Sequence, residues 1–378
     1  MTRARGFSGQ AQAAEFVVDI MTMADWDVRR VWLPVLRREE KAGLLSRLGV
    51  LAQLVPVWIG TLAKWPARGN IILYLGQTAF SMIRGGVCFR ILSVGNARSH
   101  RIISLHGSVF MGWTRESREA RLLRWVTSKA TRVTVLGSNQ AKQLEALGIP
   151  AKSIAIVRNT CLLDPIDAND IANKFSGLRA ATEPARLLFL SNLIPSKGYP
   201  TYLEALELLG GERDGRPIEA ALCGPLHQSD FGGRFATFDE AKCWIENKIA
   251  KINRSSRVHV TWVHGARGED KQKLFRNAHV FVLPTEYAVE AQPLVVIEAM
   301  ASACAVITSD RGEIPFMLEG EGIVLSELSP ARVAEAIGEL VNNPERAEAM
   351  AAALHQLFLR RFSYEQHAEK WHELYAIV

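Results

Sequence analysis

Short unbroken runs of Val, Ile and Leu recur along the chain and alternate with segments of helical periodicity. The strand-like runs are Val31–Val35, Ile71–Leu75, Ile102–Leu105, Val133–Leu136, Ile154–Val157, Leu187–Leu190, Glu219–Cys223, Val258–Val263, Val280–Leu283, Ala305–Thr308 and Ile323–Leu325. Apolar runs without polar alternation indicate strands that are buried on both faces, as in parallel sheets covered by helices. Their alternation with helices predicts βαβ units and an α/β fold.

The 378 residues are enough for two domains. A segment rich in Asp, Asn and Ala, Leu162–Pro184, interrupts the alternation and separates five or six predicted strands on each side. We therefore expect two doubly wound parallel sheets. The predicted boundaries are an N-terminal domain at 1–165, a linker at 166–184 and a C-terminal domain at 185–361. A final helix, 362–378, is predicted to return to the N-terminal domain.

The charges are unevenly distributed. Residues 1–180 carry 25 Lys and Arg against 12 Asp and Glu, whereas the rest carry 20 against 27. This excess of basic residues predicts an anionic partner for the first half.

The most apolar stretch, Leu48–Ala63, is shorter than the ~20 residues of a membrane span. Its basic flanks and nearby tryptophans would suit a helix lying on an anionic membrane surface. A buried helix of an α/β domain fits the same pattern and is the interpretation we prefer.

The cysteines and the N-terminus indicate the compartment. Five cysteines without a CxxC pair fit reduced thiols better than a disulfide framework. The first residues, MTRARGFSGQAQ, lack the apolar core of a signal peptide. We expect a cytoplasmic protein that can associate peripherally with the inner face of the cytoplasmic membrane.

The segment after the strand Val280–Leu283 carries two carboxylates. A helix is predicted to begin near Pro293, with Glu290 in the loop before it and Glu298 inside it. Ligands of open α/β sheets bind at the carboxyl ends of strands, and a helix N-terminus there favours an anion such as a diphosphate. The two carboxylates could bind hydroxyls on either side of that diphosphate. Two solvent-exposed glutamates would have the same spacing.

The residues EAQPLVVIEAMA resemble the E-x7-E segment of family 4 glycosyltransferases. Those enzymes are retaining, use nucleotide sugars and have the GT-B fold, with two Rossmann-like doubly wound domains facing a cleft. Further segments follow in the family's order: 102-IISLHGSVF-110, 135-VLGSNQAKQL-144, 154-IAIVRNT-160, 187-LLFLSNLIPSKGYPTYLEALELL-209, 222-LCGP-225 and 280-VFVLPTEY-287.

This resemblance implies roles for particular residues. Glu290 would bind hydroxyls of the transferred sugar and Glu298 the ribose of the nucleotide. Lys197 would contact the diphosphate, although a solvated loop lysine is the alternative. His106 would lie near the sugar and the β-phosphate, although it could instead cap a turn. The catalytic set implied is His106, Lys197 and Glu290.

The implied donor-binding set is larger. Gly107 would allow a close backbone approach, and the segment 292–295 would hold the phosphates with backbone N–H groups. The full set is Gly9, Gly107, Asn192, Lys197, Gly224, Glu290, Gln292, Pro293, Leu294, Val295 and Glu298.

No metal or other cofactor is predicted. Asp25-Trp26-Asp27 matches the DxD pattern of some other glycosyltransferases, but it precedes a predicted strand where related chains have a surface turn, so we do not assign it. Asp164, Asp167 and Asp170 lack the glycine and final glutamate of a calcium loop. The nine histidines show no HxH or HExxH spacing.

The sequence also departs from the family's pattern. The arginine usual five positions before the lysine is Asn192, Ala303 and Ala305 replace a glycine and a proline, and 312-GEIPF-316 replaces Gly-Gly-x-Pro-Glu. The segment 6–21 resembles the glycine loop and helix that normally follow a first strand, yet no apolar run precedes it. These departures motivate a rival hypothesis: a catalytically impaired relative that binds a nucleotide sugar or a partner protein.

The leading hypothesis is a metal-independent, retaining hexosyltransferase of cell-surface polysaccharide biosynthesis. It would transfer a sugar from a UDP- or GDP-linked donor to a saccharide or lipid-linked saccharide. The basic first half would face a lipid diphosphate or an anionic membrane surface rather than nucleic acid. A GT-B epimerase or phosphorylase is a third interpretation, and the short chain argues against a phosphorylase.

Overall fold

Every strand-like run that falls within the described part of the chain forms a parallel strand. The structure is a computed structural model, and it describes residues 9–30, 55–56, 59, 69–94, 99–211, 215–227, 233–254, 257–287 and 290–376. The chain divides into two units. Unit 1 is Met1–Arg158 with Ala368–Val378, and unit 2 is Asn159–His367.

Unit 1 contains a sheet of four described strands in the order β1-β2-β3-β4. They are β1 (Ile71–Tyr74), β2 (Arg101–Ser104), β3 (Arg132–Val135) and β4 (Ile154–Ile156). The helices in the described part of this unit include α1 (Gly9–Met23), α3 (Ala79–Ser93), α4 (Arg118–Thr127) and α5 (Ser138–Ala146), with short 3-10 turns at Val109–Gly112 and Ala151–Ser153. Five or six strands were expected here, and the predicted strand Val31–Val35 lies outside the described residues.

The end of the chain belongs to unit 1. Helix α14 (Tyr364–Ala376) begins in unit 2, and its residues from Ala368 onward are part of unit 1. There the ring of Tyr375 packs against Trp26 and His100, with centroids 5.3 and 5.5 Å apart. The C-terminal segment therefore contributes aromatic surface to the packing of unit 1.

Unit 2 contains a sheet of six described strands in the order β10-β9-β8-β5-β6-β7. They are β5 (Ala185–Leu190), β6 (Ile218–Cys223), β7 (Val258–Val263), β8 (Val280–Leu283), β9 (Ala305–Ser309) and β10 (Ile323–Leu325). The chain winds outward in one direction through β5, β6 and β7, and in the other through β8, β9 and β10. This order is the doubly wound topology that the sequence predicts.

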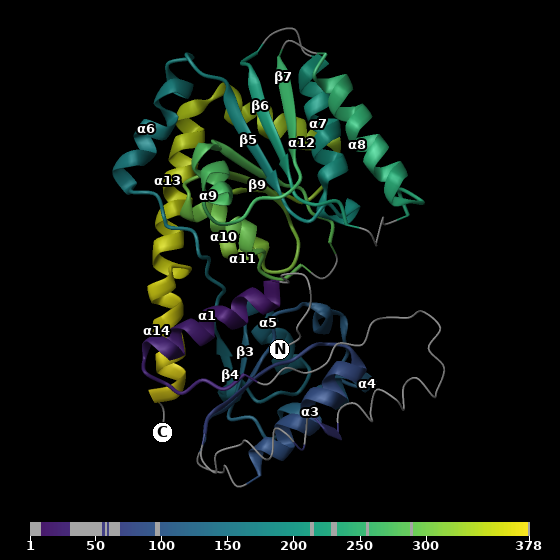
Figure 1. Cartoon of the computed structure of the whole chain (residues 1–378), viewed down its shortest axis with the longest axis vertical. Helices are drawn as coiled ribbons and strands as arrows, with labels where there is room; N and C mark the ends of the chain where they lie inside the picture. The colour runs from purple at the N-terminus through teal and green to yellow at the C-terminus, as the bar shows by residue number, and fades with distance from the viewer. Residues whose placement is uncertain are drawn as a thin grey trace. The chain divides into compact units, whose positions relative to one another are not determined.

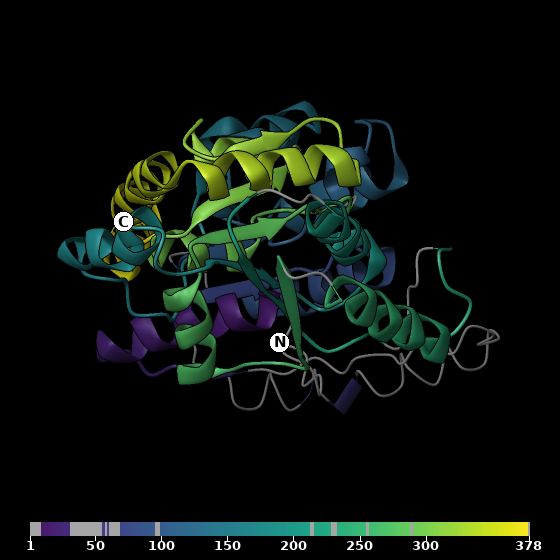
Figure 2. The ribbon, with the colours of Figure 1, turned by 90° about the horizontal axis from the view of Figure 1, so that it is seen from above.

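Helices cover both faces of the unit 2 sheet (Figures 1 and 2). One face carries α7 (Tyr199–Gly211), α8 (Phe238–Ile252) and α12 (Pro330–Asn342). The other carries α6 (Ala168–Arg179), α9 (Gly268–Asn277), α10 (Leu294–Ala301) and α13 (Pro344–Arg361), and α11 (Ile314–Leu318) lies between β9 and β10. The region predicted as a linker, 166–184, contains α6, which packs against α13 within this unit.

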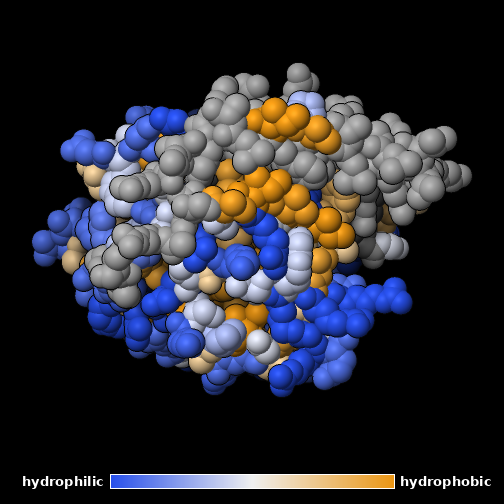
Figure 3. Space-filling view, turned by 90° about the horizontal axis from the view of Figure 1, so that it is seen from below, coloured by the Kyte–Doolittle hydropathy of each residue, from blue (hydrophilic) through white to orange (hydrophobic). Residues whose placement is uncertain are grey.

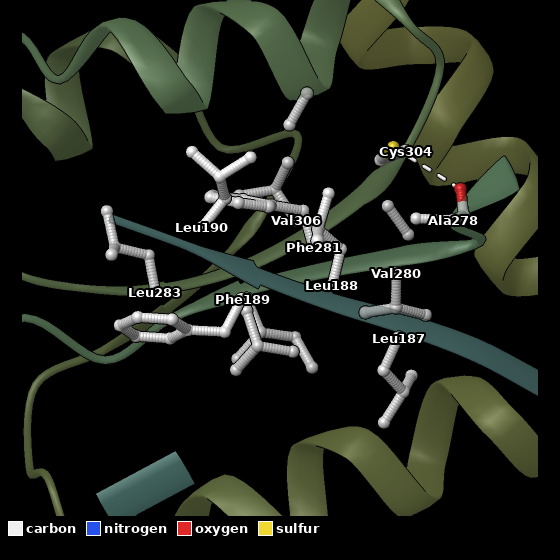
Figure 4. Packing of buried hydrophobic residues seen from close by; sticks show 14 of the residues in the cluster. Leu187, Leu188, Phe189, Leu190, Ala278, Val280, Phe281, Leu283, Cys304 and Val306 are labelled. Atoms are coloured by element: carbon white, nitrogen blue, oxygen red, sulfur yellow. Dashed lines mark hydrogen bonds between the residues drawn. The ribbon is translucent and has the colours of Figure 1, made fainter. Parts of the chain in front are cut away.

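The core of unit 2 is built on β5 and β8 (Figure 4). Leu187, Leu188 and Phe189 of β5 and Val280 and Phe281 of β8 are all at most 2% exposed. Burying such side chains contributes about 1.5–3 kcal/mol each relative to exposure. The unbroken apolar runs therefore lie in the middle of the sheet, where both faces are covered.

Polar side chains fix where several helices begin. The side chains of Thr237, Ser329 and Asn343 accept a hydrogen bond from the backbone N–H three residues later, at the starts of α8, α12 and α13. Such N-caps contribute about 1 kcal/mol each to the stability of the fold.

Among the described residues, no helix is both long enough and apolar enough to cross a bilayer. Most of Leu48–Ala63 lies outside the description, which includes only Val55, Pro56 and Ile59.

Candidate functional site

The winding of the unit 2 sheet reverses between β5 and β8, which are hydrogen-bonded neighbours. A crevice forms outside the carboxyl ends of strands at such a reversal, because the two connections leave in opposite directions. Lys197 lies in the loop after β5, and Glu290 lies in the loop after β8. The fold thus brings two predicted site residues, 93 positions apart in sequence, to the place where α/β sheets bind ligands.

The loop after β5 approaches the loop after β8 very closely. It contains a 3-10 turn, Pro195–Lys197, followed by Gly198 with φ +88°. A Cβ at Gly198 would lie 1.9 Å from the carbonyl oxygen of Pro284, so only glycine fits. The sequence KG therefore has a local cause: the glycine lets the chain turn beside β8 and places the lysine against the second loop.

Lys197 and Glu290 contact each other directly. The Lys197 Nζ lies 2.5 Å from Glu290 Oε2, with 17% and 7% of the side chains exposed. The hydroxyl of Thr285 also donates to Glu290 Oε2, at 3.2 Å. The Lys197 ammonium lies 4.3 Å from the centroid of the Tyr287 ring, within the range of a cation–π interaction. A fixed cation and a fixed carboxylate thus adjoin at the strand ends.

The loop after β9 packs against the backbone of Glu290. Gly312 has φ +57°, and a Cβ there would lie 2.0 Å from the carbonyl oxygen of Glu290. The backbone N–H of Glu313 donates to the carbonyl of Ala291 at 3.1 Å. The glycine of GEIPF, a segment that departs from the family's pattern, is therefore required by the backbone beside Glu290.

Helix α10 begins at Leu294, with Pro293 as its N-cap. The first N–H groups of a helix have no acceptor inside the helix, so Leu294 and Val295 present donors at this end, whereas Pro293 has none to offer. Gln292 fixes the approach to the helix through Asn159. The Asn159 backbone N–H donates to Gln292 Oε1 at 2.7 Å, and the Asn159 side chain donates to the Gln292 carbonyl at 3.0 Å.

Glu298 lies in the middle of α10 and is 1% exposed. Its Oε1 accepts from Lys271 Nζ at 2.5 Å, and its Oε2 is buried without a hydrogen-bond partner among the described residues. Burial raises the pKa of Glu298, while Lys271 opposes that rise. Glu290 is also buried, at 6% exposed. The alternative of two solvent-exposed glutamates is therefore wrong.

Two other predicted donor-binding residues lie at neighbouring strand ends. Asn192 is exposed in the loop after β5. Gly224 follows β6, and its carbonyl accepts from the indole N–H of Trp262 at 3.2 Å. These positions agree with the predicted strand–loop pattern, and their roles remain predictions.

The remaining predicted residues lie in unit 1. His106 follows β2, and its Nε2 lies 3.0 Å from the Ser104 hydroxyl, which in turn accepts from Thr134 at 2.8 Å. The His106 and Tyr74 rings pack with centroids 5.2 Å apart. The Gly107 carbonyl accepts from the Gln140 side chain at 3.3 Å. Gly9 is the first residue of α1.

Three residues of the site carried no prediction. Lys271 is the ion-pair partner of Glu298, Thr285 binds Glu290, and Asn159 holds Gln292. Lys271 and Thr285 come together with their partners only through the sheet topology or a loop turn, and no spacing indicates this. Asn159 and Thr285 lie in two of the segments that carry the family resemblance, IAIVRNT and VFVLPTEY, but neither had an assigned role.

In the part of the chain that the structure describes, no group of three or more His, Cys, Asp or Glu side chains could hold a metal ion. Metal independence stays a prediction.

Parts of the chain are similar to known proteins. Residues 170–356 match the family model of "Glycosyl transferases group 1". α-Maltose-1-phosphate synthase of Mycolicibacterium smegmatis is 35% identical over 132 residues, which cover 32% of this chain and 34% of the relative. A GDP-mannose-dependent α-(1-6)-phosphatidylinositol monomannoside mannosyltransferase of Mycobacterium tuberculosis is 24% identical over 269 residues, covering 68% and 64%.

A lipopolysaccharide 1,2-N-acetylglucosaminetransferase of Salmonella typhimurium is 24% identical over 228 residues, covering 60% of this chain and 57% of the relative. The matches thus span between about one third and just under two thirds of these curated relatives.

Solved structures of low sequence identity share the fold over nearly the whole chain. Sucrose-phosphate synthase from Thermosynechococcus elongatus has a TM-score of 0.67 at 17% identity, covering 98% of this chain and 93% of its own. HepE from Anabaena in complex with UDP-glucose has a TM-score of 0.63 at 16% identity, covering 99% and 98%. Residues 170–356 therefore form a domain of the glycosyl transferases group 1 family, and the chain has a GT-B fold.

Proposed function

We propose that the protein is a retaining glycosyltransferase that transfers a sugar from a nucleoside diphosphate sugar to a saccharide or lipid-linked saccharide. The observation that carries the proposal is the contact between Lys197 and Glu290 at the reversal of the unit 2 sheet. A cation and a carboxylate 2.5 Å apart suit two adjacent groups of one ligand: a phosphate and the hydroxyl-bearing sugar attached to it.

Each described group then has a defined task in the reaction. Lys197 and the first N–H groups of α10 stabilise the charge that develops on the leaving diphosphate. Glu290 accepts hydrogen bonds from sugar hydroxyls and fixes the orientation of the sugar. The bond between the anomeric carbon and the β-phosphate oxygen breaks, and the acceptor oxygen forms its bond on the same face of the sugar. The hydroxyl proton of the acceptor passes to the departing phosphate, so no protein base is required.

The class of acceptor is also part of the proposal. Two of the relatives are named for transfer to a phosphatidylinositol mannoside and to lipopolysaccharide. The basic first half of this chain would complement a lipid-linked or otherwise anionic acceptor. We therefore propose a saccharide carried on a lipid of the cell surface as the acceptor.

The test measures sugar transfer or donor hydrolysis in EDTA by the wild type, Glu290→Ala and Glu286→Ala. Glu286 is the matched control, because it is an exposed glutamate in the same loop. We expect wild-type turnover in EDTA and a loss of about a hundredfold or more for Glu290→Ala, comparable to removing a group that stabilises the transition state. Full activity of Glu290→Ala would contradict the site. Loss of wild-type activity in EDTA would contradict metal independence.

A second function is favoured by one observation. Asn192 stands in the exposed loop after β5, where a bidentate arginine is usual in related chains, so the diphosphate has one cation fewer there. A non-catalytic subunit that binds a nucleotide sugar would tolerate that loss. Thermal-shift titration with UDP, GDP and ADP, combined with the transfer assay, separates the two functions, since a ligand of the folded state raises the melting temperature whether or not turnover follows. Binding without turnover on any acceptor would favour the subunit.

A further inference from the structure

Lys271 contacts the buried carboxylate of α10 from a different helix. Lys271 is the fourth residue of α9 (Gly268–Asn277), and its Nζ is 2.5 Å from Glu298 Oε1. Only 17% of the Lys271 side chain and 2% of the Glu298 side chain are exposed. A surface pair of this kind would contribute little, but this pair is largely shielded from water, and removing one partner would leave a buried charge uncompensated.

Lys271 is the single cation that faces Glu298 among the residues with described placement. From the segment before α6, the Cys161 thiol faces the same carboxylate, and burial raises its pKa to about 12, so it is neutral. Strands β8 and β9, which pack on α10, contain no titratable residue.

The other polar groups near α10 contact backbone carbonyls at or beyond the end of the helix, not Glu298. The Nδ1 atom of His355 in α13 lies 3.3 Å from the carbonyl oxygen of Met300. Lys174 of α6 donates to the carbonyls of Ser302 and Ala303, beyond the end of the helix. The charge of Glu298 is therefore balanced from α9 alone within the described part of unit 2.

The two oxygens of Glu298 differ in their surroundings. Oε1 has the lysine, whereas Oε2 is buried with no hydrogen-bond partner among the described residues. Leaving a buried acceptor without a hydrogen bond destabilises the folded state, and more so when the acceptor is charged. An arrangement of this kind points to a donor supplied by a ligand.

We propose that Lys271 is a positioning residue for the nucleotide: it anchors Glu298 Oε1 and balances its charge, so that Oε2 accepts a hydrogen bond from a ribose hydroxyl of the donor. This inference rests on the proposed function. It predicts that the site distinguishes ribonucleotides from deoxyribonucleotides, because a nucleotide without the bonded hydroxyl leaves Oε2 unsatisfied.

The experiment measures the dissociation constants of UDP and GDP and of their 2′-deoxy and 3′-deoxy forms. The proteins are the wild type, Lys271→Met, Lys271→Arg, and Lys273→Met as the matched control. Lys273 is an exposed lysine two positions further along α9. A hydrogen bond to a charged group is worth about 1.5–3 kcal/mol, so the wild type should bind a ribonucleotide about tenfold or more tighter than one of its deoxy forms.

We expect the discrimination in Lys271→Met to fall to about threefold or less, with recovery in Lys271→Arg. Without its cation, Glu298 becomes protonated at a higher pH. As the pH is lowered, the affinity of Lys271→Met for the ribonucleotide should therefore begin to fall at a higher pH than the affinity of the wild type does. A residue that only stabilised the fold would change neither the ratio nor the pH profile. If Lys271→Met does not fold, Lys271→Gln tests the same ratio, because the amide can donate to Oε1 without a charge.

Two outcomes would overturn the inference, and they are distinguishable. Wild-type discrimination and an unchanged pH profile in folded Lys271→Met would reject the role of Lys271 and leave the proposed function standing. A wild type that binds none of these nucleotides would reject the proposed function, and this inference with it.

Discussion

Asn192 is one of the positions at which this chain departs from the glycosyltransferases it resembles. It lies in the loop after β5, five positions before Lys197, and its side chain is exposed. A guanidinium there could form two parallel hydrogen bonds to a diphosphate, whereas a neutral amide forms weaker ones. Arg311, in the loop after β9, is another residue that could supply a guanidinium.

Substitution of Asn192 by arginine is expected to tighten the binding of UDP or GDP. A charged hydrogen bond contributes about 1.5–3 kcal/mol, which corresponds to about a tenfold or greater decrease in the dissociation constant. Isothermal titration calorimetry of Asn192→Arg and of Asn192→Gln measures it, with the glutamine variant as the neutral control. Equal affinities in all three proteins would mean that no phosphate lies within reach of this position.

The sequence located the site residues better than it described their surroundings. The positions of Lys197 and Glu290 at two strand ends followed from apolar runs and from the resemblance to family 4 glycosyltransferases. The burial of Glu298 and its pairing with Lys271 did not, because they depend on how α9 and α10 are brought together by the sheet. The need for glycine at position 312 likewise depends on a carbonyl 22 residues earlier in the chain.

At the scale of elements, strands were predicted more accurately than helix ends. Val258–Val263, Val280–Leu283 and Ile323–Leu325 have the predicted bounds, since a buried parallel strand begins and ends where its apolar run does. The helical periodicity of 115–130 and 202–209 predicts α4 and α7, and the observed ends of these helices lie two or three residues away from those bounds. Their ends depend on capping contacts, as at Ser117, which periodicity does not reveal.

His279 joins three elements of unit 2 at the start of β8. Its ring is fully buried, its Nδ1 accepts from the backbone N–H of Arg186 in β5 at 3.1 Å, and its Nε2 lies 3.1 Å from the carbonyl of Lys174 in α6. Nε2 also lies 2.9 Å from Nη2 of Arg186, and this nearby cation disfavours a second proton on the ring. Burial, followed by the charges of Arg186 and Lys174, lowers the pKa of His279 to about 3.

This histidine should make the protein less stable in acid. Between its ordinary pKa of about 6.5 and the folded value of about 3, the unfolded chain binds a proton that the folded chain does not. The free energy of unfolding therefore decreases as the pH falls through this window, by at most about 1.4 kcal/mol per pH unit from this group. His279→Gln should reduce that slope.

Urea unfolding of the wild type, His279→Gln and His372→Gln between pH 4.5 and 7 measures the slopes. His372 is exposed in α14 and serves as the control. Burial also lowers the pKa of His355, so part of the slope should remain in His279→Gln. The same slope in His279→Gln and in the wild type would show that His279 does not carry this effect.

At the scale of the whole molecule, the uneven charge coincides with the division into units. The excess of basic residues lies within 1–180, most of which is unit 1. On α4, the side chains of Arg118, Arg121 and Trp125 are exposed at positions three and four apart, so they share one face of the helix. On α3, Ile83 is 46% exposed. Figure 3 shows apolar groups among hydrophilic ones on the side viewed from below.

A basic helix face that also exposes a tryptophan is suited to the surface of an anionic membrane, with about 1 kcal/mol of attraction per cation near that surface. We therefore predict that the protein floats with vesicles containing phosphatidylglycerol, that it floats less with purely phosphatidylcholine vesicles, and that added salt weakens the association.

The double variant Arg118→Glu/Arg121→Glu should lose most of this binding, because it reverses two charges on the proposed contact face. The control is Lys242→Glu/Lys251→Glu, which makes the same change on α8 in the acidic half of the chain, where both lysines are about half exposed or more. Equal flotation with both kinds of vesicle, or equal loss in both double variants, would mean that α4 does not direct the protein to an anionic surface.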